Sequence, residues 1–162
     1  AIAEHQGPVY LRFGRPSVPN FTTEDLGFEI GKGILLQPGT DVTLVATGHL
    51  VWEALEAAKE LASEGISAEV INIHTIKPLD DEIILNSVQK TGCLVSAEEH
   101  NYLGGMGESI ARLLATKNPC PMEFVATQDT FGESGTPAQL MEKYGLNKSA
   151  IVQKVHAVRK RI

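Results

Sequence analysis

The sequence predicts an α/β fold, a three-layer sandwich in which helices cover both faces of a mixed, mostly parallel sheet of about five strands. From residue 41 onwards, short apolar runs alternate with longer segments in which apolar residues recur at helical spacing. Such alternation is typical of βαβ units, whose right-handed crossovers generate a mainly parallel sheet. The chain has 162 residues, 43% of them hydrophobic, which suits one compact domain with a sizeable core.

Two predicted strands come before the regular alternation. Residues 9–13, Val-Tyr-Leu-Arg-Phe, are predicted as a short strand. Residues 14–20 are predicted as a linker, because two prolines and a glycine prevent regular structure there. Residues 33–37 are predicted as an edge strand that ends at the turn Pro38-Gly39.

Four further strands are predicted from unbroken apolar or β-branched runs, which indicate strands buried on both faces. They span residues 42–47, 68–73, 93–97 and 122–126.

Helices are predicted between these strands. The first carries apolar residues at helical spacing from Leu50 to the C-cap candidate Gly65, and the second begins at the N-cap Asp80 and ends at Gly92. A glycine-rich turn and a third helix, with Ile110, Leu113 and Leu114 facing inward, separate the last two strands.

The last third of the chain predicts two more helices, at residues 137–144 and 148–161. The second would bury apolar residues at helical spacing, and both helices are expected to cover a face of the sheet. The residues in question are Ile151, Val155, Val158 and Ile162.

Composition argues against two classes of partner. The formal net charge of -6 argues against a protein that binds the nucleic-acid backbone, which needs clustered Lys and Arg. The one basic cluster, residues 159–161, is expected at a helix C-terminus, where cations are favoured. No apolar run approaches the ~20 residues of a membrane span, so no membrane contact is expected.

The two cysteines, Cys93 and Cys120, lack both C-x-x-C spacing and a nearby histidine framework, which argues against zinc and redox sites. Both lie beside or inside apolar runs, so they are expected to be buried and reduced, and the protein to be cytoplasmic. The chain starts at Ala1 rather than at a methionine. We therefore expect a piece of a longer polypeptide or a processed product.

A glycine-rich loop lies between a predicted strand and a predicted helix, where backbone N–H groups can bind phosphate. Its glycines are Gly104, Gly105 and Gly107. The fingerprint G-x-G-x-x-G would need glycine at Ile110, and the Walker lysine is absent. Acidic residues around the loop also oppose an anion. They are Glu98, Glu99 and Glu108. The sequence therefore favours a structural role, in which the glycines allow positive φ and close approach to a neighbouring chain or domain.

Residues 98–101, Glu-Glu-His-Asn, follow a predicted parallel strand, and α/β sites commonly lie at such strand ends. They are candidates for metal ligands or an acid/base pair, but their spacing is not that of a known metal site. A polar interface is the commoner role, and a monovalent-cation or water site stays open. The predicted interface loop comprises Glu98, Glu99, His100, Gly104, Gly105, Gly107 and Glu108.

Two other kinds of side chain are candidates for function. His49 and His74 follow successive strands and would converge above the sheet, or else serve as capping or surface residues. Arg12 and Arg15 flank the end of the first predicted strand, where they would hold a phosphate or form an ordinary linker ion pair. No catalytic or metal-binding residue is assigned, and no G-x-S-x-G nucleophile elbow is present.

Taken in order, these pieces resemble the transketolase family of thiamine-diphosphate enzymes. Each stretch alone is loose, but the ordered set covers nearly the whole chain and is specific. The stretches are residues 7–16, 31–33, 45–48, 76–80, 95–100 with 104–108, and 131–137.

The resemblance implies a domain arrangement. In this family a diphosphate-binding domain comes first, a pyrimidine-binding domain second and a C-terminal domain third. Residues 1–19 would be the tail of the second domain and a linker, and residues 20–162 the transketolase C-terminal domain. The family's Gly-Asp-Gly…Asn-Asn motif for magnesium and diphosphate is missing, as is the glutamate that activates the thiamine pyrimidine. The chain would therefore bind no cofactor alone and would need an N-terminal part, fused or separate, that holds thiamine diphosphate and magnesium.

The resemblance also implies a function. The parent enzyme would transfer a two-carbon ketol unit between sugar phosphates in the pentose phosphate pathway, as a homodimer that this chain helps assemble, and the chain alone would be inactive. In transketolases an arginine at the end of the second domain holds the sugar phosphate, and Arg15 matches it better than Arg12. Deoxyxylulose-phosphate synthase, a 2-oxo acid dehydrogenase beta subunit and a non-catalytic interaction or regulatory module are the alternatives.

Overall fold

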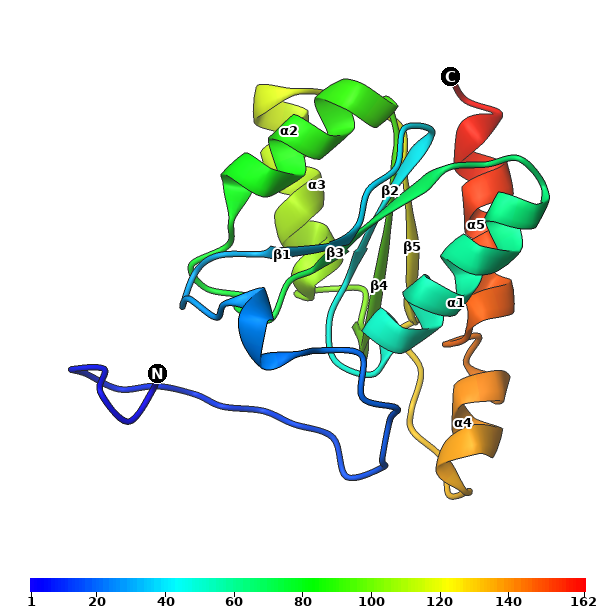
Figure 1. Ribbon diagram of the computed structural model, residues 1–162. Helices are drawn as coiled ribbons and strands as arrows, with labels where there is room; N and C mark the ends of the chain where they lie inside the picture. Colours follow the sequence, from blue (N-terminus) through cyan, green and yellow to red (C-terminus); the bar gives the residue numbers. More distant parts are fainter.

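A central sheet of five strands lies between two layers of helices in the computed structural model, which describes residues 1–162 (Figure 1). In chain order the elements are η1 (Glu24–Leu26, a 3-10 helix), β1 (Ile34–Gln37), β2 (Val42–Ala46), α1 (Leu50–Ser63), β3 (Ala68–Asn72), α2 (Asp81–Thr91), β4 (Leu94–Asn101), α3 (Met106–Lys117), β5 (Met122–Thr127), α4 (Pro137–Lys143) and α5 (Lys148–Arg159). The predicted α/β sandwich is confirmed. None of the helices has the length and apolar character needed to cross a membrane.

The strands of the sheet have the order β1-β3-β2-β4-β5. The strands β3, β2, β4 and β5 run parallel, whereas β1 pairs antiparallel with β3 at one edge. The sheet is therefore mixed and mostly parallel, as predicted. Because β2 and β4 are neighbours, their carboxyl ends lie side by side at one edge of the sheet, the edge where parallel α/β folds usually bind ligands.

Residues that alternate along a strand reach different helical layers. Val42 and Leu44 of β2 belong to a core cluster shared with α1 and α5, whereas Val45 belongs to a second cluster shared with α2 and α3. Every residue of β2 is buried. Burial on both faces requires an unbroken apolar run, which explains why such runs predict the four parallel strands.

Only one of the two C-terminal helices covers the sheet. Ile151, Val155 and Val158 of α5 are buried in the cluster that α1 also joins, as predicted. The prediction is wrong for α4, which has no buried residue and lies below the end of the sheet in Figure 1. It is also wrong for Ile162, which is 64% exposed because α5 ends at Arg159.

The helix ends of α2 lie where the sequence places them. The Asp80 carboxylate accepts a hydrogen bond from the backbone N–H of Ile83 at 3.3 Å and a second from that of Gly33 at 2.8 Å. Asp80 therefore caps the helix and also ties the start of β1 to it. At the other end, Gly92 adopts a left-handed conformation with φ of 77°.

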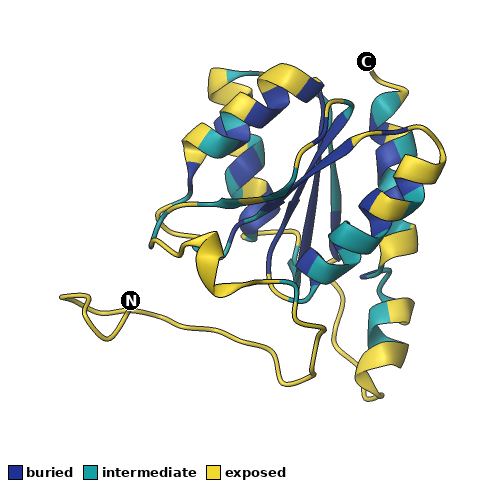
Figure 2. Ribbon diagram, in the orientation of Figure 1, coloured by how far each residue is buried: buried dark blue, intermediate teal, exposed yellow.

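Residues 1–20, which we call the N-terminal segment, form no strand and are exposed throughout (Figure 2). Tyr10 and Phe13 are 87% and 84% exposed. The strand predicted at residues 9–13 is therefore wrong for this structure, because no other strand lies beside it and an unpaired strand is not stable in water. The first side chain that packs against the hydrophobic core is Phe21, whose ring stacks on Trp52 of α1.

Candidate functional site

Several of the residues singled out in the sequence meet at the carboxyl edge of the sheet. We call Arg12, His49, Glu98, Glu99 and His100 the edge cluster. Three of them stand on β4, His49 directly precedes α1, and Arg12 comes from the N-terminal segment. The strand β4 continues to Asn101, beyond the end predicted at residue 97, so the three β4 residues belong to a strand and not to a loop.

Glu98 is fully buried and closes the N-terminus of α3. Its carboxylate accepts hydrogen bonds from the backbone N–H groups of Met106 at 2.7 Å and Gly107 at 2.8 Å. These are the unpaired donors of the first helical turn, where the helix dipole favours a negative charge. The position that a bound phosphate would take is thus filled by Glu98, and the phosphate interpretation of the glycine-rich loop is not supported.

Each of the three glycine positions in the loop requires glycine for a different structural reason. Gly104 is exposed and has a φ of 74°, which favours glycine. A Cβ on Gly105 would lie 2.6 Å from the Glu98 carboxylate, and a Cβ on Gly107 would lie 2.7 Å from Phe124. The sequence suggests a close approach between this loop and a neighbouring chain or domain. At Gly105 and Gly107 the close approach is to Glu98 and Phe124 of the same chain.

Burial divides the predicted interface loop into two sets. Glu98 and Gly107 are buried within the chain, where each packs against other parts of the same chain. The rest of the loop is partly or fully exposed. Its members are Glu99, His100, Gly104, Gly105 and Glu108.

His100 links Glu98 to the N-terminal segment. Its Nδ1 lies 3.2 Å from a carboxylate oxygen of Glu98, and its Nε2 contacts the guanidinium of Arg12. Glu98 contacts both His100 and the start of α3, whereas Glu99 contacts His49 at the start of α1, in the other helical layer. A strand predicted as far as residue 100 would have brought Glu98 and His100 together. The prediction stops at residue 97 because the residues that follow are polar.

His49 has its own carboxylate partner. Its Nδ1 lies 3.3 Å from Glu99, and both side chains are mostly buried. The backbone of Gly14 lies close beside the His49 ring, so that a Cβ on Gly14 would lie 2.4 Å from a ring carbon. His49 therefore also contacts the N-terminal segment.

His49 and His74 do not share a partner, although their strands are neighbours. The ring of His74 packs at a tilt against Phe28, with 4.2 Å between ring centroids, and its Nδ1 lies 3.0 Å from the hydroxyl of Thr75. Burial lowers the pKa of His74. The two arginines also differ: Arg12 contacts His100, whereas no hydrogen bond or ion pair joins exposed Arg15 to the rest of the chain.

A hollow of about 490 Å³ adjoins the edge cluster. The N-terminal segment lines one side with Pro16, Ser17 and Val18, and His49 and Glu99 line another. The remaining wall comes from the start of α1 and from residues 127–146. Carboxylate, imidazole and hydroxyl groups in this wall can accept hydrogen bonds from a polyol. No Lys or Arg lines the hollow, so a positive charge for a phosphate would have to come from the arginines of the N-terminal segment.

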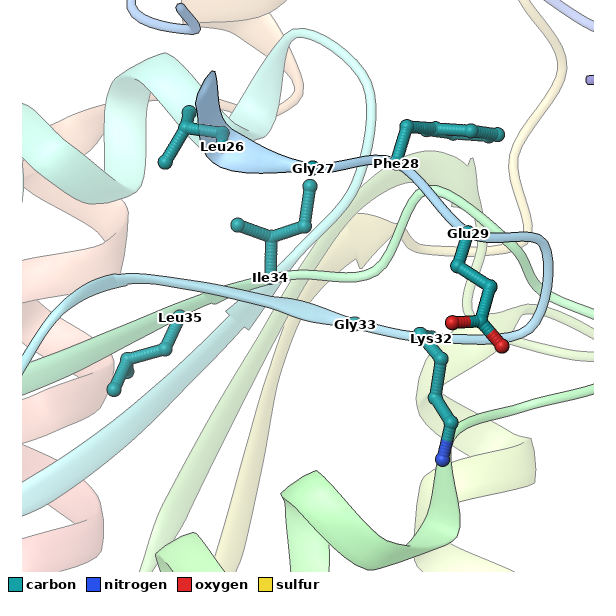
Figure 3. A pocket seen from close by; sticks show the side chains of 8 residues that line it. All are labelled: Leu26, Gly27, Phe28, Glu29, Lys32, Gly33, Ile34 and Leu35. Atoms are coloured by element: carbon teal, nitrogen blue, oxygen red, sulfur yellow. The ribbon is translucent and has the colours of Figure 1, made fainter. Parts of the chain in front are cut away.

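A second hollow, of about 460 Å³, lies between η1 and β1 (Figure 3). Figure 3 shows Leu26 and Ile34 at one end and Glu29 and Lys32 at the other. Lys32 is already paired with Glu82 at 3.8 Å. This hollow lies apart from the edge cluster and contains no group of interacting catalytic side chains. No group of three or more His, Cys, Asp or Glu side chains in the chain is arranged to hold a metal ion.

Comparison with known proteins identifies the family to which the fold belongs. Residues 31–151 match the family described as "Transketolase, C-terminal domain". This chain belongs to the transketolase family. The family resemblance carried by the sequence motifs is confirmed.

Two relatives of this transketolase C-terminal domain are described as a transketolase subunit and as a split-gene transketolase. The 6-deoxy-6-sulfo-D-fructose transketolase subunit of a Clostridium species is 46% identical over 160 residues, which cover 99% of this chain and 50% of that subunit. A solved structure described as a split-gene transketolase, an inactive beta4 tetramer, superposes with a TM-score of 0.94 at 45% identity and covers 98% of this chain and 52% of that one. The chain thus spans about half the length of these relatives.

A third relative has a different activity. The 1-deoxy-D-xylulose-5-phosphate synthase of Heliobacterium modesticaldum is 37% identical over 153 residues, which cover 93% of this chain and 24% of that enzyme. The transketolase C-terminal domain is therefore shared between enzymes that form different products.

The residues of this transketolase domain do not fit a thiamine diphosphate cofactor. The one helix N-terminus with a glycine-rich approach is filled by Glu98, and Glu99 and Glu108 stand close by in sequence. Carboxylates at this position oppose a diphosphate. No step of a thiamine-dependent reaction can therefore be assigned to these residues alone.

Proposed function

We propose that this chain is the C-terminal part of a thiamine-diphosphate-dependent transketolase that transfers a two-carbon ketol unit between sugar phosphates. The observation that carries the proposal is the match over nearly the whole chain to about half of a transketolase subunit. The cofactor and its magnesium would bind to an N-terminal part of the enzyme, fused or encoded separately. Because Glu98 fills the one candidate cradle, the chain alone would be inactive.

The proposal includes a domain boundary near residue 20. Residues 1–19 would be the tail of the pyrimidine-binding domain, and residues 20–162 the C-terminal domain. The exposure of Tyr10 and Phe13 supports this boundary, because large apolar side chains that are exposed together usually pack against another surface. The stacking of Phe21 on Trp52 marks the first contact with the core of the domain.

Arg15, with Arg12 second, would hold the anionic end of the substrate. Arg15 is exposed and unpaired, and it directly precedes the residues that line the hollow beside the edge cluster. A guanidinium binds a phosphate through two parallel hydrogen bonds. The relative that acts on 6-deoxy-6-sulfo-D-fructose suggests that a sulfonate is a second possible anionic group.

The assembled enzyme would be a homodimer, and the exposed part of the predicted interface loop would contribute to the dimer contact. Leu103 is 53% exposed beside Gly104, which supports a contact surface at this loop. The two cysteines are unpaired, which supports a reducing, cytoplasmic location. Phosphorylated pentoses as substrates would place the enzyme in the pentose phosphate pathway.

The experiment reassembles the chain with a thiamine-diphosphate-binding N-terminal part and measures ketol transfer to a phosphorylated aldose. We expect activity from the mixture and none from either part alone. Replacing Arg15→Ala should raise KM for the phosphorylated acceptor by about 10-fold to 100-fold, because a charge-assisted bidentate contact is worth about 1.5–3 kcal/mol. Arg12→Ala should raise it less, and kcat should change little in both variants.

Arg112→Ala, an exposed change on α3, is the matched control and should leave KM unchanged. An acceptor without a phosphate should not distinguish Arg15→Ala from the unchanged chain. Equal KM values for the phosphorylated acceptor would remove the substrate role of Arg15, and ketol transfer by the isolated chain would overturn the proposed division of labour.

A 1-deoxy-D-xylulose-5-phosphate synthase is the second candidate, favoured by the 37% identity to such an enzyme. Assaying the reassembled enzyme for 1-deoxy-D-xylulose 5-phosphate separates the two activities. Formation of that compound without ketol transfer would replace the first proposal by this one.

A further inference from the structure

The edge cluster contains two histidines that are held in the same way on opposite faces of β4. Glu98 holds His100, and Glu99 holds His49, each through the Nδ1 atom of the ring at 3.2 Å and 3.3 Å. Glu98 reaches the start of α3 in one helical layer, and Glu99 reaches His49 at the start of α1 in the other. The two glutamates therefore hold one imidazole each, on different sides of the sheet. Each ring then contacts the N-terminal segment with its remaining surface.

The contact between His100 and Arg12 depends on the charge of the histidine. An arginine can only donate hydrogen bonds, so the Nε2 atom that meets Arg12 must be an acceptor. The proton of a neutral His100 then lies on Nδ1, which donates to the buried carboxylate of Glu98. Protonation of His100 would place a second N–H against the guanidinium, turning an attraction into a clash of two donors and two positive charges.

The contact between His49 and Gly14 depends on shape. The ring lies where a Cβ of residue 14 would be, 2.4 Å from the ring carbon Cε1. The backbone of Gly14 has no positive φ, so an alanine there would be disfavoured by the contact with His49 and not by its own conformation. The two histidines therefore meet the segment at Arg12 and at Gly14, on either side of Phe13.

We infer that His100 and His49 are positioning residues that seat residues 12–14 of the N-terminal segment on the C-terminal domain, and that protonation of His100 releases Arg12. The residue that follows this seat is Arg15. One consequence of the inference rests on the proposed function: holding residues 12–14 in place determines where Arg15 presents its guanidinium. The seating itself is a property of this chain and is tested without substrate.

The charged groups around His100 are few. Glu98 faces it from β4 and Arg12 from the N-terminal segment. Two acidic side chains on the segments that follow β4 and β5 have partners of their own: Glu108 accepts from the N–H of Gly104, and Asp129 accepts from Asn101 at 2.8 Å. Arg12 is therefore the group whose interaction with His100 changes sign when the ring gains a proton.

Trypsin cleavage measures how firmly residues 12–14 are held against His100 and His49. Trypsin cuts after Arg12, whereas the bond after Arg15 is resistant because Pro16 follows. Cleavage within the basic residues 159–161 at the other end of the same chain serves as the internal reference and cancels the pH dependence of the protease. The measured quantity is the ratio of the two cleavage rates in the intact chain between about pH 8 and about pH 5.5, the range in which imidazoles change charge.

Two substitutions separate the two ring nitrogens of His100. The amide oxygen of His100→Gln reaches the Nε2 position and can accept from Arg12 at every pH. The shorter His100→Asn keeps only the Nδ1 position beside Glu98. Gly14→Ala disturbs the second contact without touching His100.

For the unchanged chain we expect the ratio to rise about threefold to tenfold as the pH falls, in keeping with the loss of one solvent-exposed hydrogen bond of ordinary net strength. His100→Gln should keep a low ratio that does not depend on pH, and His100→Asn a high ratio at every pH. Gly14→Ala should raise the ratio and keep its pH dependence. A ratio that is flat with pH and equal in the unchanged chain and in His100→Asn would overturn the inference.

Kinetics of the reassembled enzyme then separate this inference from the proposed function. If both hold, His100→Asn raises KM for the phosphorylated acceptor and His100→Gln restores it, with kcat unchanged. If the cleavage ratios behave as expected but KM does not change, the two histidines do hold residues 12–14, and the substrate role of the arginines fails. If the cleavage ratios are flat, the seat fails whatever the value of KM.

Discussion

The side chain of His74 shows how burial sets the charge of a single residue. Its Nε2 is buried without a hydrogen-bond partner, and its ring packs against Phe28. Burial disfavours the charged form of the ring, so the pKa of His74 is lowered from the ordinary value of 6.5. The neutral ring is thus the form that fits the folded chain.

This lowered pKa predicts a loss of stability in acid. The unfolded chain binds a proton at His74 at a higher pH than the folded chain does, so the free energy of unfolding falls as the pH drops below about 6.5. His74→Gln removes this contribution, and its unfolding free energy should therefore fall less between pH 7.5 and pH 5. Urea unfolding at the two pH values measures the difference. His5→Gln, at an exposed histidine, should behave like the unchanged chain. A steeper fall in His74→Gln would contradict the assignment.

Single residues could be predicted where their role is local. Asp80 and Gly92 have the predicted roles because helix caps depend on the few residues around them. Glu98 could not be predicted as a cap, because it lies on the preceding strand, eight positions before the first residue of the helix that it closes. The contact of Arg12 with His100 joins residues 88 positions apart and leaves no periodic signal in the sequence.

At the level of elements, the connection between β1 and β2 packs directly against the start of β3. The backbone N–H groups of Thr40 and Asp41 donate to the carbonyl of Ser67 at 3.0 Å and 2.8 Å. Gly39 is buried, and its N–H lies 3.3 Å from the Glu69 carboxylate. A Cβ on Gly39 would lie 2.2 Å from the backbone of Ala68. The connection is therefore held at a distance that only glycine permits.

Gly39→Ala should destabilise the fold by about 3 kcal/mol, because the added methyl group meets rigid strand backbone and not a movable side chain. The matched control is Gly132→Ala, where the methyl group would have nothing within 4 Å, and this change should stay within about 0.5 kcal/mol. Both values come from denaturant unfolding of the two variants beside the unchanged chain. Equal stability of the two variants would show that the connection can move away from β3.

The elements themselves could be predicted to the extent that they are buried. The apolar run at residues 42–47 predicts β2 because that strand is covered on both faces. The polar end of β4 could not be predicted, because Glu98 to Asn101 carry no apolar pattern, although the strand pairs with β5 as far as Asn101. The run at residues 9–13 has the composition of a strand but has no neighbouring strand in this structure.

On the scale of the whole molecule, Cys93 reports on the integrity of the core. It is fully buried in a cluster of 21 residues that joins the sheet to α1 and α5. Burial raises the pKa of the Cys93 thiol to about 11, so the reactive thiolate is scarce at neutral pH. Access to this thiol requires separation of the helical layer from the sheet.

In a Cys120→Ala variant, a thiol reagent should therefore modify Cys93 only when the whole fold opens. The rate should be at least about a thousandfold below that of the unfolded chain, and it should rise with urea along the slope of global unfolding. The Cys93→Ala variant retains only Cys120, which is partly exposed and should react faster. Modification of Cys93 at a rate independent of urea would show that the layer opens locally.

The carboxylate at the start of α3 also bears on how such loops are recognised in other sequences. A strand, a run of glycines and a helix together suggest a nucleotide cradle, yet here the chain supplies its own counter-charge from residue 98. A glutamate eight positions before the first helical residue therefore marks a loop whose backbone N–H groups are already bound by the chain's own carboxylate. Searching for that acidic position beside the glycines would distinguish self-sealed loops from open ones by their amino-acid pattern alone.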